Sequence, residues 1–200
     1  MKRNLLYTVL LFTIVLISSS CTNSNAHSIN IETKKYQVSE GLNIGNKLPN
    51  IELRNRNGEF TSLHNLKGHV VLVDFWASWC GPCRRENAHL INSYAKYKRA
   101  NFKNANGFEI FSVSLDGGTD RRGNKILDAK EKWLSAIKED KLNWANHVSE
   151  LNGWESGVVN QFEIQGIPCN YLIDANGKII AQNLRGEALN QQLDKLLLTQ

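Results

Sequence analysis

The sequence predicts an α/β fold in which a sheet of mixed direction is flanked by helices. Two apolar runs, at residues 70–76 and 107–115, have the near-continuous hydrophobic character of buried central strands. Segments with helical spacing of apolar residues follow these runs, and two strand-like segments separated by a turn signal lie near the C-terminus. Alternating strands and helices that end in a hairpin are typical of this fold class.

The first predicted element is an N-terminal hairpin, whose strands at 48–53 and 59–63 flank the turn signal Asn57-Gly58. The strand at 70–76 follows. After it, residues 81–99 form a predicted helix with one apolar side, made by Leu90, Ile91, Tyr94 and Ala95.

A helix-bearing central insertion follows the strand at 107–115. Residues 116–125 form a predicted loop, and 126–141 and 156–162 form predicted helices. The first of these helices takes its apolar positions from Leu127, Trp133, Leu134 and Ile137. Of the tryptophans at 133, 144 and 154, we expect most in the core, and we expect His147 at the surface or behind the site.

The C-terminal part is a predicted hairpin followed by a closing helix. Strands at 170–174 and 178–182 flank the turn Ala175-Asn176-Gly177. The closing helix has an apolar face made by Leu189, Leu193, Leu196 and Leu197.

The N-terminus has the features of an export signal. Lys2 and Arg3 precede an apolar stretch at 5–17, which is shorter than the roughly 20 residues of a membrane span. Small residues then lead directly to Cys21, and this pattern resembles a bacterial lipoprotein signal. The resemblance implies removal of residues 1–20, lipidation of Cys21, and a location in the cell envelope, facing the periplasm. Ordinary cleavage near Ser20 that leaves a free Cys21 is the alternative.

Composition and charge indicate one exported globular domain. Residues 21–40 are polar and form a predicted flexible tether, so the domain spans 41–200. Loss of Lys2 and Arg3 with the signal lowers the formal charge from +5 to +3. A net positive charge this small does not indicate nucleic-acid binding.

The most informative motif is Cys80-Gly81-Pro82-Cys83, which follows the apolar strand at 70–76 and opens the predicted helix. A cysteine at a helix N-terminus lies near unpaired backbone N–H groups and the positive end of the helix dipole, which stabilise its thiolate. A second cysteine three residues later can resolve a mixed disulfide. The motif therefore favours thiol–disulfide exchange.

Two structural explanations for the motif are weaker. A structural zinc site needs four ligands, and no second Cys-x-x-Cys pair or suitably spaced histidine pair accompanies this one. A purely structural disulfide would close a very short loop and would therefore gain little chain entropy.

The segment from Val73 to Cys83, followed by Gly166-Ile167-Pro168, resembles thioredoxin. The preceding hairpin, the central insertion and the export signal make the chain similar to the TlpA/ResA-like thiol–disulfide oxidoreductases. This resemblance covers residues 41–200 and implies a thioredoxin-like fold.

The resemblance also implies roles for individual residues. Cys80 would be the exposed nucleophile and Cys83 the buried resolving thiol, with the Cys80–Cys83 disulfide as the redox group and no further cofactor or metal. Asp74 would be a buried carboxylate whose pKa is raised by burial, so that it can accept a proton from Cys83.

The same comparison implies a substrate groove around the active-site turn. Gly81 and Pro82 would form that turn, and Pro82 would favour reduction. Pro168 would be a cis-proline, with Ile167 beside it, facing the disulfide. Trp79 would be an exposed wall of the groove, whereas Trp76 would pack beneath it.

Three positions depart from the family pattern. Ala88 stands where relatives usually have a proline that bends the helix, which implies a straighter helix. Cys169 follows the expected cis-proline and is either a third redox thiol or a small buried residue that starts a strand. Asp116 is a weak substitute for a catalytic glutamate, and a loop residue ending a strand is the favoured interpretation.

The expected function is that of a lipid-anchored enzyme that reduces disulfides of exported proteins. Its partners would be those proteins, a membrane electron donor and the membrane itself. An oxidase or isomerase role is the nearest alternative. A peroxiredoxin-like peroxidase is disfavoured because Ala77 and Val73 replace the residues expected before its reactive cysteine. A copper carrier would use the two thiols and Cys169 as soft ligands.

Overall fold

The computed structural model of the chain describes residues 38–120 and 122–198. The predicted signal at 1–20, Cys21 and the tether as far as residue 37 lie outside the described residues. Within the described residues, the fold includes Ser39, which lies before the predicted domain boundary at 41 and whose carbonyl accepts a hydrogen bond from the Lys47 N–H at 3.0 Å.

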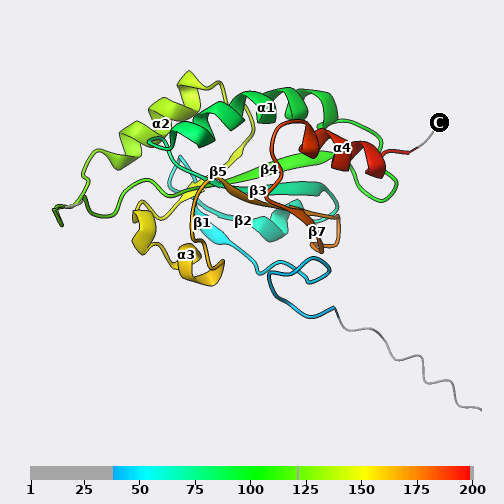
Figure 1. The fold of residues 1–200 in the computed structure, drawn as a ribbon, viewed down its shortest axis with the longest axis horizontal. Helices are drawn as coiled ribbons and strands as arrows, with labels where there is room; N and C mark the ends of the chain where they lie inside the picture. Colours follow the sequence, from blue (N-terminus) through cyan, green and yellow to red (C-terminus); the bar gives the residue numbers. More distant parts are fainter. Residues whose placement is uncertain (1–37, 121, 199–200) are drawn as a thin grey trace, which may run out of the picture. The chain divides into compact units, whose positions relative to one another are not determined.

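A five-stranded sheet in the order β5-β4-β3-β6-β7 forms the centre of the domain (Figure 1). Strands β3, β4 and β5 run parallel, whereas β6 pairs antiparallel with β3 and with β7. The mixed direction confirms the predicted fold class. The strands span Val70–Trp76 (β3), Phe108–Ser114 (β4), Asn146–Ser149 (β5), Cys169–Ile173 (β6) and Ile179–Gln182 (β7).

The predicted N-terminal hairpin is present as a separate two-stranded sheet. Its strands are β1 (Glu52–Arg54) and β2 (Phe60–Ser62), which pair antiparallel around the Asn57-Gly58 turn. Gly58 has φ +88°, a left-handed conformation that glycine adopts without strain. A 3-10 helix at Leu63–Leu66 then leads to β3.

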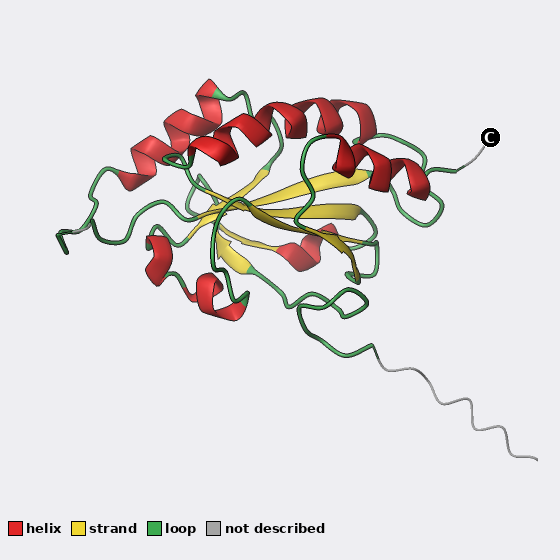
Figure 2. Cartoon of the chain, viewed as in Figure 1, coloured by secondary structure: helices red, strands yellow, loops and turns green. Residues whose placement is uncertain are grey.

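Helices cover both faces of the central sheet (Figures 1 and 2). The connections from β3 to β4 and from β4 to β5 are parallel crossovers, and the usual right-handed sense places their helices on the same face. That layer contains α1 (Gly81–Tyr97), α2 (Ala129–Glu139) and α4 (Glu187–Leu196). The short α3 (Gly157–Gln161) and the β1–β2 hairpin lie on the other side.

Strand β3 is buried along its whole length, as its apolar sequence predicts. Helix α1 runs without interruption past Ala88, where the sequence lacks the proline of the relatives. In the described part of the chain, no helix has both the length and the apolar character that crossing a membrane requires.

The central insertion differs from its sequence-based description. Helix α2 begins at Ala129, so Leu127 lies before it and is 87% exposed rather than on its apolar face. A 3-10 helix at Gly153–Glu155 precedes α3. Two of the three tryptophans, Trp133 and Trp144, are fully buried, whereas Trp154 is 46% exposed.

His147 is fully buried, so the expected surface position is wrong. It lies in β5, an edge strand that was not predicted, and its ring stacks on Trp144 with centroids 5.3 Å apart. Its Nε2 is 3.3 Å from the Leu142 carbonyl oxygen. Burial lowers the pKa of His147 to about 4, so the ring is neutral at neutral pH.

Candidate active site

The Cys-Gly-Pro-Cys motif lies at the junction of β3 and α1. Cys80 caps the N-terminus of α1, and its Sγ accepts a hydrogen bond from the Cys83 N–H at 3.2 Å. Pro82 lies in the first turn, where the missing N–H of proline is not needed by the helix. The cap therefore provides the donor and the helix end that stabilise a thiolate on Cys80.

Cys80 and Cys83 form a disulfide in this structure. Cys80 is 5% exposed and Cys83 1%, so the expected order of exposure holds, but Cys80 is not an exposed side chain in this state. Cys80 is buried because the loop at Ile167 packs against it, and the Cys80 Sγ is 3.8 Å from the Ile167 carbonyl oxygen. The adjoining Gly81 and Pro82 are exposed and leave an approach to the disulfide.

The loop before β6 lies against the disulfide. The Ile167–Pro168 peptide bond is cis, the isomer that the family resemblance implies. Both residues are partly buried, and the Pro168 carbonyl accepts a hydrogen bond from the Arg185 guanidinium. Arg185 also donates to the Leu184 carbonyl at 2.6 Å, so it joins this loop to the segment before α4.

Asp74 is a buried carboxyl group in the middle of β3. Burial is the main cause that raises its pKa to about 7, and the nearby Glu86 acts in the same direction. The Arg185 guanidinium and the Asn170 amide oppose this rise. A carboxyl group with a pKa near neutrality can exchange a proton at physiological pH.

Two charged residues near Asp74 were not predicted from the sequence. Glu86 lies on α1, one turn after Cys83, and accepts a hydrogen bond from the Gly186 N–H at 2.7 Å. The sequence could have placed Glu86 near the site, because it is three residues after Cys83 in a predicted helix and residues three apart share a helix face. Arg185 is about 100 positions from the motif, and only the tertiary fold brings it there.

Cys169 is the first residue of β6, is partly buried and has a free thiol. Its pKa is raised, mainly by burial and also by Asp74, although Arg185 acts in the opposite direction. A buried thiol with a raised pKa is a weak nucleophile at neutral pH. These surroundings fit the small buried residue better than the third redox thiol.

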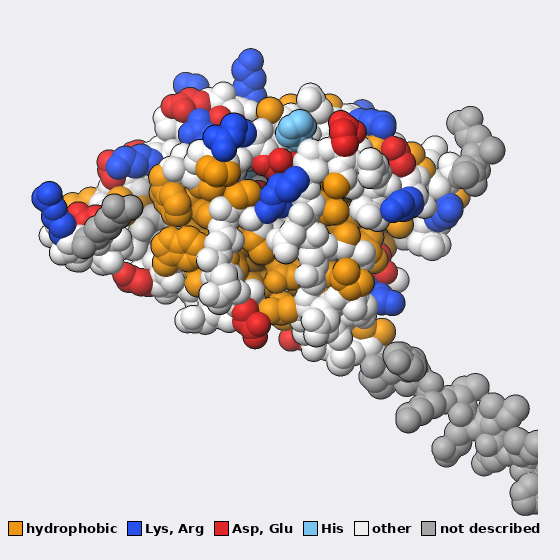
Figure 3. Space-filling model, viewed as in Figure 1, with side chains coloured by type: hydrophobic (Ala, Val, Ile, Leu, Met, Phe, Trp, Pro, Cys, Tyr) orange, Lys and Arg blue, Asp and Glu red, His pale blue; other side chains and the backbone are white. Residues whose placement is uncertain are grey.

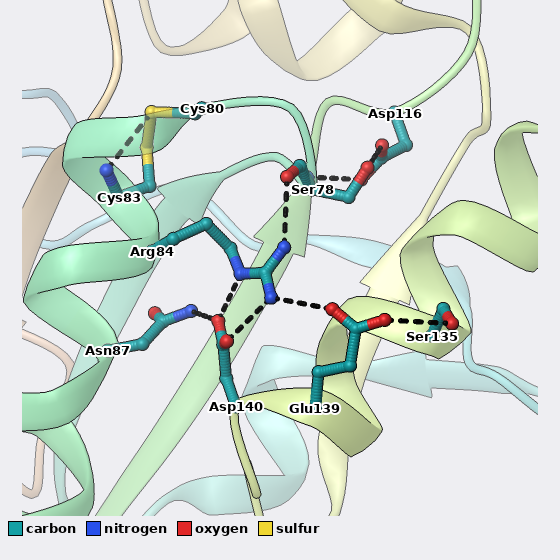
Figure 4. A network of polar contacts seen from close by, with 9 residues as sticks. All are labelled: Ser78, Cys80, Cys83, Arg84, Asn87, Asp116, Ser135, Glu139 and Asp140. Carbon is teal, nitrogen blue, oxygen red and sulfur yellow. Dashed lines mark hydrogen bonds and ion pairs between the residues drawn. A yellow bond between two sulfur atoms is a disulfide. The ribbon is translucent and has the colours of Figure 1, made fainter.

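Asp116 has a defined position behind the active-site loop (Figure 4). It follows β4, as expected, but its carboxylate is buried and accepts hydrogen bonds from the hydroxyl and the N–H of Ser78, the latter at 3.0 Å. The Ser114 hydroxyl adds a third bond at 2.7 Å. Asp116 therefore holds the loop that leads to Cys80, which is more than the role of a loop residue ending a strand.

Arg84, the residue after Cys83, connects this loop to the insertion (Figure 4). Its guanidinium forms two hydrogen bonds to the Asp140 carboxylate and pairs with Glu139 at 3.0 Å. It also donates to the Ser78 carbonyl at 3.2 Å. The Asn87 amide donates to the same Asp140 carboxylate at 2.7 Å, so the end of α2 is held against α1.

Among residues 38–120 and 122–198, no group of three or more His, Cys, Asp or Glu side chains is placed to hold a metal ion. The copper-carrier alternative, which would use the two thiols of the motif and Cys169, stays a prediction.

Comparisons with known proteins agree with this geometry. Residues 44–182 match the model of the AhpC/TSA family. The chain is 27% identical over 197 residues to the thiol-disulfide oxidoreductase ResA of Bacillus thuringiensis subsp. konkukian, with 98% of this chain and 97% of the relative covered. It is 25% identical over 141 residues to ResA of Bacillus subtilis, with 70% and 67% covered.

Solved structures show the same relationship. The thioredoxin domain of a thiol-disulfide oxidoreductase from Bacteroides vulgatus superimposes with a TM-score of 0.64 and 35% identity, covering 79% of this chain and all of that one. A thiol-disulfide oxidoreductase from Bacteroides fragilis gives a TM-score of 0.61 and 35% identity, with 76% and 99% covered. The chain therefore belongs to the AhpC/TSA family of thioredoxin-like proteins and is a thiol–disulfide oxidoreductase.

Proposed function

We propose that the protein is a lipid-anchored reductase that donates electrons from the Cys80–Cys83 dithiol to disulfides of exported proteins. The observation that carries this proposal is the position of Cys80 at the N-terminus of α1, where its sulfur accepts the Cys83 N–H and lies beside Ile167. This arrangement favours a thiolate at the point where a substrate disulfide can approach.

The proposed reaction has two exchange steps. In the reduced protein, the Cys80 thiolate attacks one sulfur of the substrate disulfide, and the other substrate sulfur leaves as a thiolate. Cys83 then loses its proton to Asp74 and attacks the Cys80 sulfur of the mixed disulfide. This closes the Cys80–Cys83 bond and releases the second substrate thiolate. Two electrons pass from the protein to the substrate, and the substrate thiolates take up two protons, one returned by Asp74 and one from solvent.

The proposed direction of electron flow rests on the Gly81-Pro82 spacer, which resembles that of thioredoxin. A reduction potential near about −270 mV would support a reductase, whereas a value near about −120 mV would indicate an oxidase. The potential can be measured by equilibrating the described domain with glutathione or dithiothreitol buffers. The reductant that regenerates the dithiol would be a membrane electron donor.

The proposed location rests on the sequence of residues 1–21. The export signal and Cys21 support attachment to a membrane of the cell envelope through a lipid, with the domain facing the periplasm. Substitution of Cys21 by Ser should release the protein from membranes, and metabolic labelling with a radioactive fatty acid would test the lipid directly.

Substrate trapping tests the proposal as a whole. A Cys83→Ala variant cannot resolve the mixed disulfide, so partner proteins should stay bound through Cys80 and be released by reductant. A Cys80→Ala variant is the matched control and should hold none. If both variants retain the same proteins, or neither retains any, Cys80 is not the nucleophile. A peroxidase would instead consume hydrogen peroxide in a reaction lost in Cys80→Ser but kept in Cys83→Ser.

A further inference from the structure

A cleft of about 870 Å³ lies between the active-site loop and the central insertion. Trp79, the residue before Cys80, forms one wall, and α2 and Trp154 contribute others. Figure 3 shows hydrophobic side chains gathered on the visible face between α2 and α3. The volume is within the range of sites that bind small ligands, and the exchange steps above involve none of the residues that line it.

The walls of the cleft are fixed by the polar contacts behind them (Figure 4). Arg84 holds the end of α2 through Glu139 and Asp140, and it also binds the Ser78 carbonyl. Asp116 holds Ser78 from the other side. These contacts hold α1, the end of α2 and the active-site loop together, so the cleft is preorganised for binding.

The charged side chains lining the cleft already have partners within the described part of the chain. Besides Arg84, Glu139 and Asp116, Lys132 pairs with Asp128 at 2.9 Å, and Glu155 accepts a hydrogen bond from the Thr119 hydroxyl at 2.7 Å. Asp120 accepts hydrogen bonds from backbone N–H groups of its own loop. A charged ligand would compete with these contacts, whereas an apolar one would not.

The apolar part of the lining includes two exposed aromatic side chains. The rings of Trp79 and Trp154 lie 6.4 Å apart, and their residues are 54% and 46% exposed. Adjacent exposed aromatic side chains are typical of binding surfaces. The other apolar lining residues are the partly exposed Ile126 and the buried Leu115, Ala129 and Ala136.

We propose that this cleft binds an apolar side chain of the substrate polypeptide, aromatic or large aliphatic, close to the cysteine under attack. The substrate must bring its sulfur to Cys80, and Trp79 is both the neighbour of Cys80 and a wall of the cleft. In an extended chain, a side chain two residues from the cysteine points to the same side and lies about 7 Å along the strand. This inference rests on the proposed function and adds a substrate preference to it.

Four short peptides test this preference. Each contains one cysteine blocked as a mixed disulfide with thionitrobenzoate, and has either phenylalanine or alanine two residues before or two residues after it. The reduced protein becomes a disulfide as the peptide thiol and thionitrobenzoate are released, and the release is followed by absorbance in single-turnover experiments. We expect at least one phenylalanine peptide to react about tenfold faster than its alanine counterpart, the gain that burial of a large apolar side chain provides.

Three variants locate the preference. Trp154→Ala removes a wall of the cleft and Ser135→Trp, at an exposed position of α2 that lines the cleft, fills it. Both should bring the ratio of the two rates toward one. Phe60→Ala removes an aromatic residue that is similarly exposed but lies on β2, outside the cleft, and should leave the ratio unchanged. Because the readout is a ratio within each variant, loss of folded protein cancels.

The outcomes separate this inference from the proposed function. Equal rates for phenylalanine and alanine peptides in the wild-type protein would overturn the inference alone, as would a preference that survives in both Trp154→Ala and Ser135→Trp. A wild-type protein that releases thionitrobenzoate from none of the peptides would overturn the proposed function and the inference together.

Discussion

The raised pKa of Asp74 predicts an unusual dependence of stability on pH. A carboxyl group with a pKa of 3.8 in the unfolded chain and about 7 in the folded protein binds a proton more tightly when folded. The stability associated with this group is therefore complete below pH 3.8 and is lost as the pH rises through about 7. At about 1.36 kcal/mol for each pH unit between the two values, the ionised group destabilises the fold by about 4 kcal/mol.

The Asp74→Asn substitution removes this cost while keeping the shape of the side chain. As the pH rises from about 4 to about 8, the unfolding free energy of the variant should increase by about 4 kcal/mol relative to that of the wild type. The assay is urea unfolding of both proteins at the two pH values, with the Cys80–Cys83 disulfide intact so that neither thiol titrates. Other titrating groups, such as His147, are common to both proteins and cancel in the difference.

Asp128→Asn is a control with the opposite sign. Asp128 is exposed, and its pKa is lowered mainly by the hydrogen bond from Lys132, so its ionised form is favoured in the fold. This variant should lose stability relative to the wild type as the pH rises. If instead the difference between Asp74→Asn and the wild type is the same at both pH values, burial does not raise the pKa of Asp74 and the proposed proton transfer loses its basis.

Three further predictions concern the framework of the site. Replacing Arg84 by Met should lower the unfolding free energy by about 1–3 kcal/mol, because the partly buried Asp140 keeps the Asn87 amide but loses its charged partner. A double-mutant cycle with Asp140→Asn, measured by urea unfolding, should show coupling. Burial lowers the pKa of His147 from 6.5 to about 4, so the stability contribution of this residue is lost as the pH falls through this interval. Between about pH 7 and pH 4, the unfolding free energy of His147→Gln, measured with urea, should therefore fall by about 3 kcal/mol less than that of the wild type. Gly117→Ala would place a Cβ 2.1 Å from the Leu151 carbonyl oxygen at φ +99°, and should cost at least about 2 kcal/mol in the same assay; an unchanged midpoint would show that the backbone there adjusts freely.

The elements predicted well are those whose residues share one environment. Strand β3 has the predicted bounds because every residue in it is buried, and the Asn57-Gly58 and Asn176-Gly177 turns are fixed by local backbone geometry. Strand β5 was missed because Asn146–Ser149 is polar, short and at a sheet edge, so neither hydrophobicity nor alternation marks it. Its pairing with β4 is a tertiary effect.

The candidate site divides in a similar way. The motif and the loop at Pro168 could be located from local sequence and the family resemblance, because both are contiguous segments. Arg84, Asp116 and Arg185 could not be assigned, since each acts through partners from other elements. The surface position predicted for His147 was wrong because a histidine gives no sign of burial in the sequence; its burial accompanies the pairing of β5 with β4 and the stacking of its ring on Trp144.

The way the backbone enters the domain has a practical consequence. Lys47 and Leu48 join the sheet beside the turn between β6 and β7, where the Leu48 N–H donates to the Gly177 carbonyl, and that turn neighbours the start of β3. Cys80 follows the opposite end of β3. Polypeptide that precedes residue 39 therefore joins the fold near the end of β3 that is remote from the reactive sulfurs. An affinity tag or a fusion partner attached through this segment suits immobilisation of the enzyme on a solid support.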